Sequence, residues 1–315
     1  MKTQLFQTEL FRKIIFITVA ASCFTPLISP PIALLLGIVI SQLFANPFKK
    51  HTSKATKILL QCSVVGLGFG INIFEAAKAG QDAIIFTIAT IGLTILLGIL
   101  VGKLLAINRK STILISVGTA ICGGSAIAAV SPVIEANENE MSVSLGIVFM
   151  LNTLALFIFP VIGHFINLSQ AQFGWWSAIA IHDTSSVVGA AHAFGEEALR
   201  IATTIKLERA LWIIPVSLVT AFFFKTSGRK ITIPYFIFLF IAAMAVNTFI
   251  PQIHSIGEFI VLLSKKGLTL TLFLIGTGIT RSAIKAVGLR PFLLGIFLWI
   301  VISISSLLVI LKTVS

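Results

Sequence analysis

The sequence predicts an all-α, polytopic membrane protein with about eleven transmembrane helices. First, 57% of its 315 residues are hydrophobic and 11% are charged, and its mean hydropathy is +1.05. Second, apolar runs of about 20 residues, enough to cross a bilayer, recur along the whole chain. Third, the runs lack the apolar–polar alternation of barrel strands. Because lipid cannot satisfy backbone hydrogen-bonding groups, such segments must be helices.

The apolar runs define the expected spans, and the connections between them are short. The longest connection, 251–266, is too short for a soluble domain, so we expect residues 1–315 to form a single transmembrane domain. Its approximate halves are 14–166 and 171–311. The expected spans are 14–29, 31–46, 57–75, 81–103, 111–134, 140–163, 173–193, 199–224, 232–250, 267–281 and 291–311.

The net charge of +12 reflects topology rather than a nucleic-acid surface, because the basic residues lie in alternate connections. This is the positive-inside pattern of a bacterial inner-membrane protein, and it places the N-terminus in the cytoplasm. The lipid bilayer is therefore an expected partner and nucleic acid is not. The basic connections are 46–57, 103–110, 225–230 and 281–290, and the acidic ones are 135–140 and 194–198.

The first span also resembles a signal peptide, because a basic start precedes an apolar stretch that ends in "VAASC". Cleavage before Cys23 is the alternative, but a second span follows at once through Pro30 and Pro31, which favours a retained helix. The cysteines Cys23, Cys62 and Cys122 all fall within spans, so we expect core packing. No cofactor and no metal site is expected.

The stretch "GTAICGGSAIAAVSPV", residues 118–133, interrupts an apolar span. Gly123 and Gly124 together cost about 2 kcal/mol of helix propensity relative to alanine. A break there would free N–H groups at the start of a second half-helix, which Ser125 could cap. The alternative is a small-residue face for close helix packing, formed by Gly124 and Ala128 with Ser131 or Pro132. We expect a break that lines an anion-tolerant pocket.

A second polar stretch, "IHDTSSVVGAAHAFG", lies in the span 173–193. It places His182, Asp183, Thr184, Ser185 and Ser186 in succession near the middle of the membrane. An aspartate there costs about 3 kcal/mol on insertion scales and is a functional candidate by default. The alternative is an aspartate in a buried salt bridge that only fixes helix packing.

A third stretch, "IKLERALWIIP", places Lys206 and Arg209 on one helix face, whereas Glu208 points away. Lys206 could instead extend to the membrane surface, but Arg209 is too deep for this. Two cations in the membrane interior need negative groups nearby, and Asp183, Glu208 and a substrate anion could supply them. The sequence therefore predicts an anion site that joins these cations to the break at Gly123.

An internal repeat is also expected. "GTAICGGSAIAAV" from Gly118 and "GTGITRSAIKAV" from Gly276 align when one residue is deleted. They lie five spans apart, which gives the two stretches opposite orientations in the membrane. Inverted repeats with interrupted helices are typical of secondary transporters.

Three of these stretches resemble the YeiH-like family of bacterial inner-membrane proteins, which have long been catalogued as uncharacterised and are often designated sulfate exporters. The matching segments are "GTAICGGSAIAA" from Gly118, "IHDTSSVVGAA" from Ile181 and "ALRIATTIKLERAL" from Ala198. The late segment "GLTLTLFLIGTGITRSAIKAVGLRPFLLG" is similar to the C-terminal end of that family. The resemblance implies a relation to cation/proton antiporters and bile-acid symporters. It further implies two inverted five-helix units with a pair of discontinuous, crossing helices.

The expected function is secondary transport of a small anion, such as sulfate, a related sulfur oxyanion or a sulfonate, coupled to H⁺ or Na⁺. A transporter of small carboxylates and a channel-like or signalling subunit are the alternatives. An enzyme is not expected, because "GGSA" around Ser125 lacks the glycine that follows the serine of membrane serine proteases. The absence of a G-x-x-x-x-G-K-[ST] motif argues against ATP as the driving force.

Overall fold

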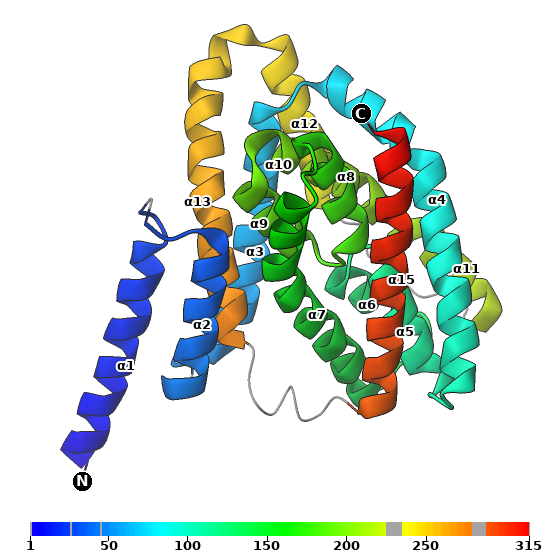
Figure 1. Ribbon diagram of the computed structural model, residues 1–315. Coiled ribbons are helices and arrows are strands. Elements are labelled where there is room, and N and C mark those ends of the chain that lie inside the picture. Colours follow the sequence, from blue (N-terminus) through cyan, green and yellow to red (C-terminus); the bar gives the residue numbers. More distant parts are fainter. Residues whose placement is uncertain (1, 26, 45, 225–234, 279–287, 315) are drawn as a thin grey trace. The chain divides into compact units, whose positions relative to one another are not determined.

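The computed structural model describes residues 2–25, 27–44, 46–224, 235–278 and 288–314. In this part of the chain the regular structure is entirely helical, which confirms the predicted all-α class (Figure 1). Two single-turn 3₁₀ helices, η1 (Gly68–Gly70) and η2 (Pro251–Ile253), join longer helices. The helices are α1 (Lys2–Ser22), α2 (Pro30–Phe44), α3 (Lys49–Leu67), α4 (Ile73–Leu104), α5 (Arg109–Ala120), α6 (Gly124–Val130), α7 (Glu138–Phe165), α8 (Gln170–Ala180), α9 (Thr184–Phe194), α10 (Glu196–Leu211), α11 (Ile213–Phe224), α12 (Tyr235–Phe249), α13 (His254–Gly278) and α15 (Leu289–Thr313).

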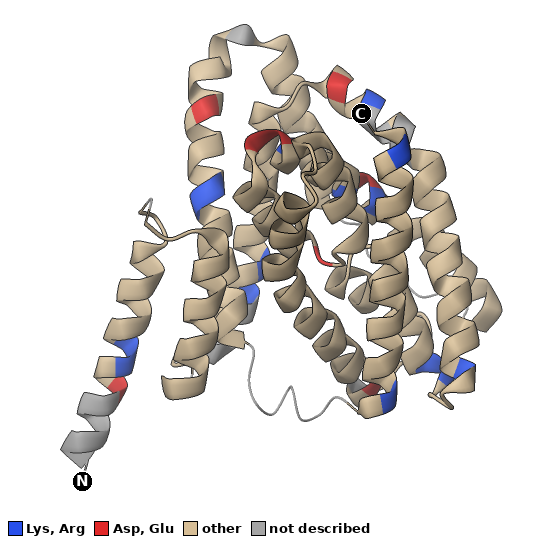
Figure 2. Ribbon diagram, in the orientation of Figure 1, with Lys and Arg blue, Asp and Glu red and all other residues tan. Residues whose placement is uncertain are grey.

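Several helices have the length and composition of transmembrane spans. Among the described residues five qualify, and two further apolar helices, α2 and α12, are shorter. The count of eleven crossings stays a prediction. Figure 2 shows most charged residues near helix ends, with long uncharged stretches between them. The five spans are Ile84–Leu104, Asn139–Phe165, Glu196–Phe224, His254–Gly278 and Leu289–Thr313.

The prediction that 251–266 is a connection is wrong, because α13 already begins at His254. Glu258, Lys265 and Lys266 made this segment look like a loop. The helix accommodates the charge at Lys266, whose Nζ donates to the carbonyl oxygen of Thr25 at 2.9 Å. A basic side chain that has a backbone partner can therefore lie inside a helix. The hydropathy pattern alone predicted a later first residue for this helix.

The helices form two compact units. The first comprises Met1–Asn72 and Phe238–Arg281, and the second comprises Ile73–Ile237 and Ser282–Ser315. Each unit combines segments from both predicted halves of the chain. The two units therefore do not correspond to the halves 14–166 and 171–311. Those halves divide the chain by sequence, as the expected repeat would.

In the first unit, α2 and α13 pack with their backbones in contact. A Cβ atom on Gly37 would overlap the carbonyl oxygen of Phe273, and one on Gly276 would overlap that of Leu34. Only glycine at both positions allows this approach. The continuous helix α13 contains Gly276 and Gly278. The rest of the predicted second repeat, 279–287, lies outside the described residues.

The second unit contains α4 to α11 and α15. An apolar cluster in this unit joins α5, α7 and α15 through Ile115, Ile147, Leu151 and Leu298. Two helices begin where the local sequence forms a capping box. Asn137 and Glu140 form the box of α7, and Ser169 and Gln172 form that of α8. This unit contains all the predicted site residues.

Candidate functional site

The first break interrupts the predicted span 111–134, as the glycine pair predicted. Helix α5 ends at Ala120, and α6 begins at Gly124. Between them Gly123 has φ +66° and ψ −126°, a conformation that L side chains rarely adopt. Glycine at this position is therefore required by the backbone.

Ser125 does not cap the second half-helix, so that part of the prediction is wrong. The N-cap position is Gly123, which has no side chain to accept a hydrogen bond. Ser125 is the second residue of α6, is exposed, and donates through its hydroxyl to the carbonyl oxygen of Cys122 at 3.1 Å. Gly124 also faces α7, where a Cβ atom would lie 3.2 Å from Phe149. Of the alternative small-residue face, this contact involves Gly124 only, because Ala128 and Pro132 are exposed.

A second break interrupts the predicted span 173–193, which we had expected to be one continuous helix. Helix α8 ends at Ala180 and α9 begins at Thr184. Asp183 is the N-cap of α9, and its carboxylate accepts from the backbone N–H of Ser185 at 3.1 Å and from the Ser185 hydroxyl. The polar run therefore lies at a break between two helices and not along one continuous helix.

The buried part of this run lies in the gap and in the first turn of α9. His182 is in the break itself and is fully buried. The first turn of α9 is buried as well, and it contains Thr184, Ser185 and Ser186. Asp183 is the one member of the run that is partly exposed.

The two breaks touch each other within the second unit. A Cβ atom built on Gly123 would lie 3.1 Å from Cα and 3.2 Å from Cβ of Asp183. The discontinuous helices α5–α6 and α8–α9 therefore meet at their interruptions. The resemblance implied a discontinuous, crossing pair, and the repeat alignment assigned the second member to the stretch at Gly276. The observed partner of the first break is instead the stretch at Asp183.

The two cations on α10 bind the carbonyl ends of the interrupted helices. Lys206 Nζ donates to the carbonyl oxygens of Ala178 at 3.2 Å and Ile181 at 2.8 Å, at the end of α8. Arg209 Nη2 donates to the carbonyl oxygen of Ala120, the last residue of α5. Cations are favourable at these negative helix ends, where four carbonyls lack helical partners.

Both cations are enclosed by protein, with an exposed fraction of 0% for Lys206 and for Arg209. Lys206 therefore does not extend to the membrane surface. Arg209 Nη1 also donates to Thr90 Oγ1 on α4 at 2.9 Å. The prediction that the two share one helix face and lie in the interior is consistent with these contacts.

The acids Asp183 and Glu208 do not form ion pairs with these two cations. The carboxylate of Glu208 accepts from Thr87 Oγ1 at 2.9 Å and from Trp212 Nε1 at 2.8 Å, so it points away from Lys206 as predicted. The carboxylate of Asp183 binds Ser185 instead. The alternative role of Asp183 was a buried salt bridge that only fixes helix packing. Such a bridge between Asp183 and Arg209 is not present in this structure.

Several buried polar groups around the crossing have no hydrogen-bond partner among the described residues. They are Thr119 Oγ1, Asn152 Nδ2, Arg209 Nε and both ring nitrogens of His182. An unsatisfied buried donor or acceptor costs about 1–3 kcal/mol. Groups of this kind in one region indicate a place where water, an ion or a ligand binds. In the described residues, no group of three or more His, Cys, Asp or Glu side chains could hold a metal ion.

Asn152 is a site residue that the sequence interpretation missed. It lies in α7 with an exposed fraction of 2%, and its Oδ1 accepts from the backbone N–H groups of His182 at 3.1 Å and Asp183 at 3.3 Å. These are backbone donors that the second break sets free. A lone amide within the apolar run "FMLNTLALF" was the available signal.

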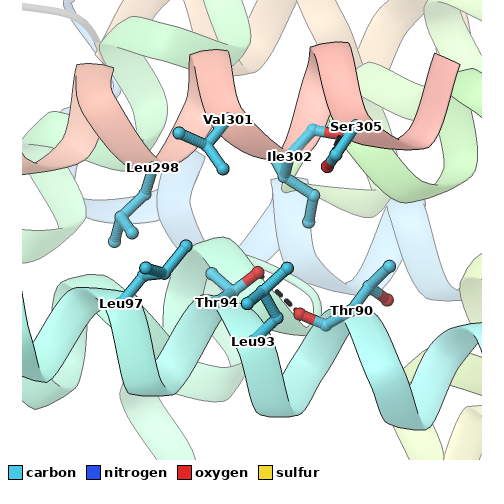
Figure 3. Close-up of a pocket in the computed structure, with 8 residues that line it drawn as sticks. All are labelled: Thr90, Leu93, Thr94, Leu97, Leu298, Val301, Ile302 and Ser305. Atoms are coloured by element: carbon cyan, nitrogen blue, oxygen red, sulfur yellow. Dashed lines mark hydrogen bonds between the residues drawn. The ribbon is translucent and has the colours of Figure 1, made fainter. Parts of the chain in front are cut away.

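Thr90 is the second missed residue, and it connects Arg209 to a cavity. The cavity is small, with room of about 10 Å³, and lies between α4 and α15 (Figure 3). Its hydroxyl groups already donate to backbone carbonyls of their own helices, as in the bond from Thr94 to Thr90 at 2.7 Å. The three-and-four spacing of Thr87, Thr90 and Thr94 was the signal, because it places all three on one helix face.

Comparison with known proteins identifies the family. A family model described as "Conserved hypothetical protein 698" matches residues 13–295. A UPF0324 membrane protein of Porphyromonas gingivalis is 54% identical over 292 residues, which are 91% of this chain and 88% of the relative. The protein PBPRB0970 of Photobacterium profundum is 48% identical over 301 residues, 96% of this chain and 92% of the relative. No solved structure matches. The chain belongs to the YeiH-like UPF0324 family of membrane proteins, as its three motif stretches predicted.

Proposed function

We propose that the protein is a secondary transporter of a small anion, such as sulfate, a related sulfur oxyanion or a sulfonate. The observation that carries this proposal is the contact between the two helix breaks at Gly123 and Asp183. Interrupted helices at membrane depth are tolerated where they are enclosed by protein or line a cavity, and transporters build substrate sites from them.

The hydrogen-bond donors around the crossing favour an anion as the ligand. Arg209 is buried and its Nε has no partner. Lys206 carries three N–H donors, of which two bind carbonyl oxygens. An oxyanion with several acceptor oxygens would satisfy such donors. The N-terminus of α9 contributes the positive end of a helix dipole in the same region.

The architecture of both units supports the inverted repeat that such transporters use. The first unit contains a close backbone contact at Gly37 and Gly276, and the second contains the contact between the breaks at Gly123 and Asp183. Gly276 is the residue that aligns with Gly118 in the two similar stretches. Each of these two contacts includes a helix that contains one of the two similar stretches. Transport rather than catalysis is the proposed role of the site.

Transport by this chain can be tested with the purified protein in proteoliposomes. We expect uptake of labelled sulfate that is saturable and is accelerated by unlabelled sulfate inside the vesicles. This acceleration distinguishes a carrier with an alternating site from a channel. Sulfite, a sulfonate and a small carboxylate should be tested as competitors. Protein-free vesicles are the control, and the absence of uptake for every anion in this set would contradict the proposal.

Asp183 is proposed to take part in coupling the anion to H⁺ or Na⁺ through its negative charge. Asp183→Asn keeps a good N-cap for α9, since asparagine caps as well as aspartate, but removes the negative charge. We therefore expect near-normal membrane abundance together with loss of coupled flux. Abundance on immunoblots and flux per folded molecule measure the two effects. Poor expression with normal flux per folded molecule would show that Asp183 is only structural.

The proposed location is the bacterial inner membrane, with the N-terminus in the cytoplasm. Single cysteines at Lys50 and at Asn137, in a background without Cys23, Cys62 and Cys122, test this orientation. Because basic connections face the cytoplasm, we expect an impermeant thiol reagent applied from outside to label only position 137. Labelling of both positions from outside would contradict the proposed topology.

A further inference from the structure

His182 is a buried imidazole that none of the contacts described above uses. It lies in the break between α8 and α9, and its exposed fraction is 0%. Its backbone N–H binds Asn152, but neither Nδ1 nor Nε2 has a hydrogen-bond partner. A neutral imidazole always has one bare nitrogen that can accept a proton.

Charged groups surround the ring on the elements packed around it. Lys206 on α10 binds the carbonyl oxygen of Ile181, the residue before His182. Arg209 lies one turn further along α10, and the positive charges of Lys206 and Arg209 both oppose a proton on the ring until a negative charge is added nearby. Asp183 follows His182 directly, and Glu208 lies on α10 with its carboxylate bound to Thr87 and Trp212. From the other break, the Cys122 thiol lies 3.1 Å from Ser125 Oγ.

The formal charges of these groups cancel when the imidazole is neutral. Lys206 and Arg209 contribute two positive charges, and Asp183 and Glu208 contribute two negative charges. An anion that enters this enclosed site adds at least one uncompensated negative charge, which low-dielectric surroundings disfavour. A proton on His182 would offset that charge and give the ring two N–H donors.

We infer that His182 takes up a proton when the anion binds, so that the protein carries the anion together with H⁺. The inference rests on the proposed function and names its coupling ion. Binding of the two ligands must then be reciprocal: the proton strengthens anion binding, and the anion strengthens proton binding by the same factor. Affinity for the anion should fall as the pH rises and the bound proton is lost.

The test compares wild type with His182→Asn, which keeps a polar side chain of similar size but cannot take up a proton. Sulfate binding is measured as thermal stabilisation of the purified protein at about pH 5.5 and about pH 8, a range in which imidazoles change charge. For wild type we expect about tenfold tighter binding at the lower pH. For His182→Asn we expect weak binding with nearly equal affinities at both pH values.

A second readout is proton uptake from a weakly buffered solution, followed with a pH-indicator dye. Sulfate should cause uptake by wild type and by the control His164→Asn, whose imidazole is exposed at the end of α7 and stacks on Phe194. It should cause none with His182→Asn. If that variant does not fold, His182→Gln serves the same comparison.

Two failures can be told apart. Sulfate binding by wild type that is independent of pH, or proton uptake that survives in His182→Asn, would overturn the role of His182 and leave anion transport in place. Absence of binding and transport for sulfate, sulfite, a sulfonate and a carboxylate would overturn the proposed function itself.

Discussion

Gly123→Ala is expected to destabilise the protein by about 3 kcal/mol, because the residue is constrained twice. Its φ of +66° with ψ of −126° is strained for any L side chain, which costs about 1–3 kcal/mol. The new Cβ atom would also lie 3.1 Å from Asp183 Cα, so the crossing would have to open. The apparent melting temperature in detergent micelles measures the effect, and the variant should also lose anion binding.

Gly92→Ala is the matched control for this prediction. Gly92 lies within α4, where an added Cβ atom would have no neighbour within 4 Å. Alanine has the higher helix propensity by about 1 kcal/mol, so this variant should be as stable as wild type or more stable. Equal melting temperatures for Gly123→Ala and wild type would show that the two breaks do not meet as described.

Arg209→Gln is expected to reduce anion affinity by at least about thirtyfold. Loss of one partner from a buried, hydrogen-bonded charged group costs about 2–5 kcal/mol. The guanidinium also joins Thr90 to the end of α5, and only arginine can hold these partners and an oxyanion at once. Arg209→Lys should therefore be intermediate. Anion-dependent thermal stabilisation of the three proteins measures the order, and unchanged affinity in Arg209→Gln would refute the site.

A double variant separates this account from a structural ion pair. If Asp183 and Arg209 formed a closed pair, Asp183→Asn combined with Arg209→Gln would restore much of what either change removes. The carboxylate of Asp183 binds Ser185 instead, so we expect no recovery of stability or of anion binding. Recovery in the double variant would favour the pair.

The first break could be predicted from sequence and the second could not, for a physical reason. Gly123 and Gly124 weaken a helix through their own backbone propensity, which is a local property. The segment at His182 contains neither glycine nor proline. Its break is stabilised by partners distant in sequence, because Asn152 accepts the freed N–H groups and Lys206 binds the freed carbonyl of Ile181.

The hydrogen-bond partners of Lys206 and Arg209 also could not be predicted from the sequence. Helical spacing correctly placed Lys206 and Arg209 on one face, and the depth of Arg209 in the span indicated burial. Charge alone then favoured carboxylates as partners, whereas the observed acceptors are the carbonyl ends of α8 and α5. These acceptors exist only because the helices are interrupted, so they cannot be inferred before both breaks are known.

The central claim is that an anion binds beside the crossing, and locating a bound anion tests it most directly. Selenate has the shape and charge of sulfate, and its selenium atom can be located by anomalous diffraction from crystals of the protein. We predict a peak within about 4 Å of the Arg209 guanidinium, the distance set by charge-assisted hydrogen bonds to its oxygens. A peak at another place in a protein that binds selenate would contradict the account.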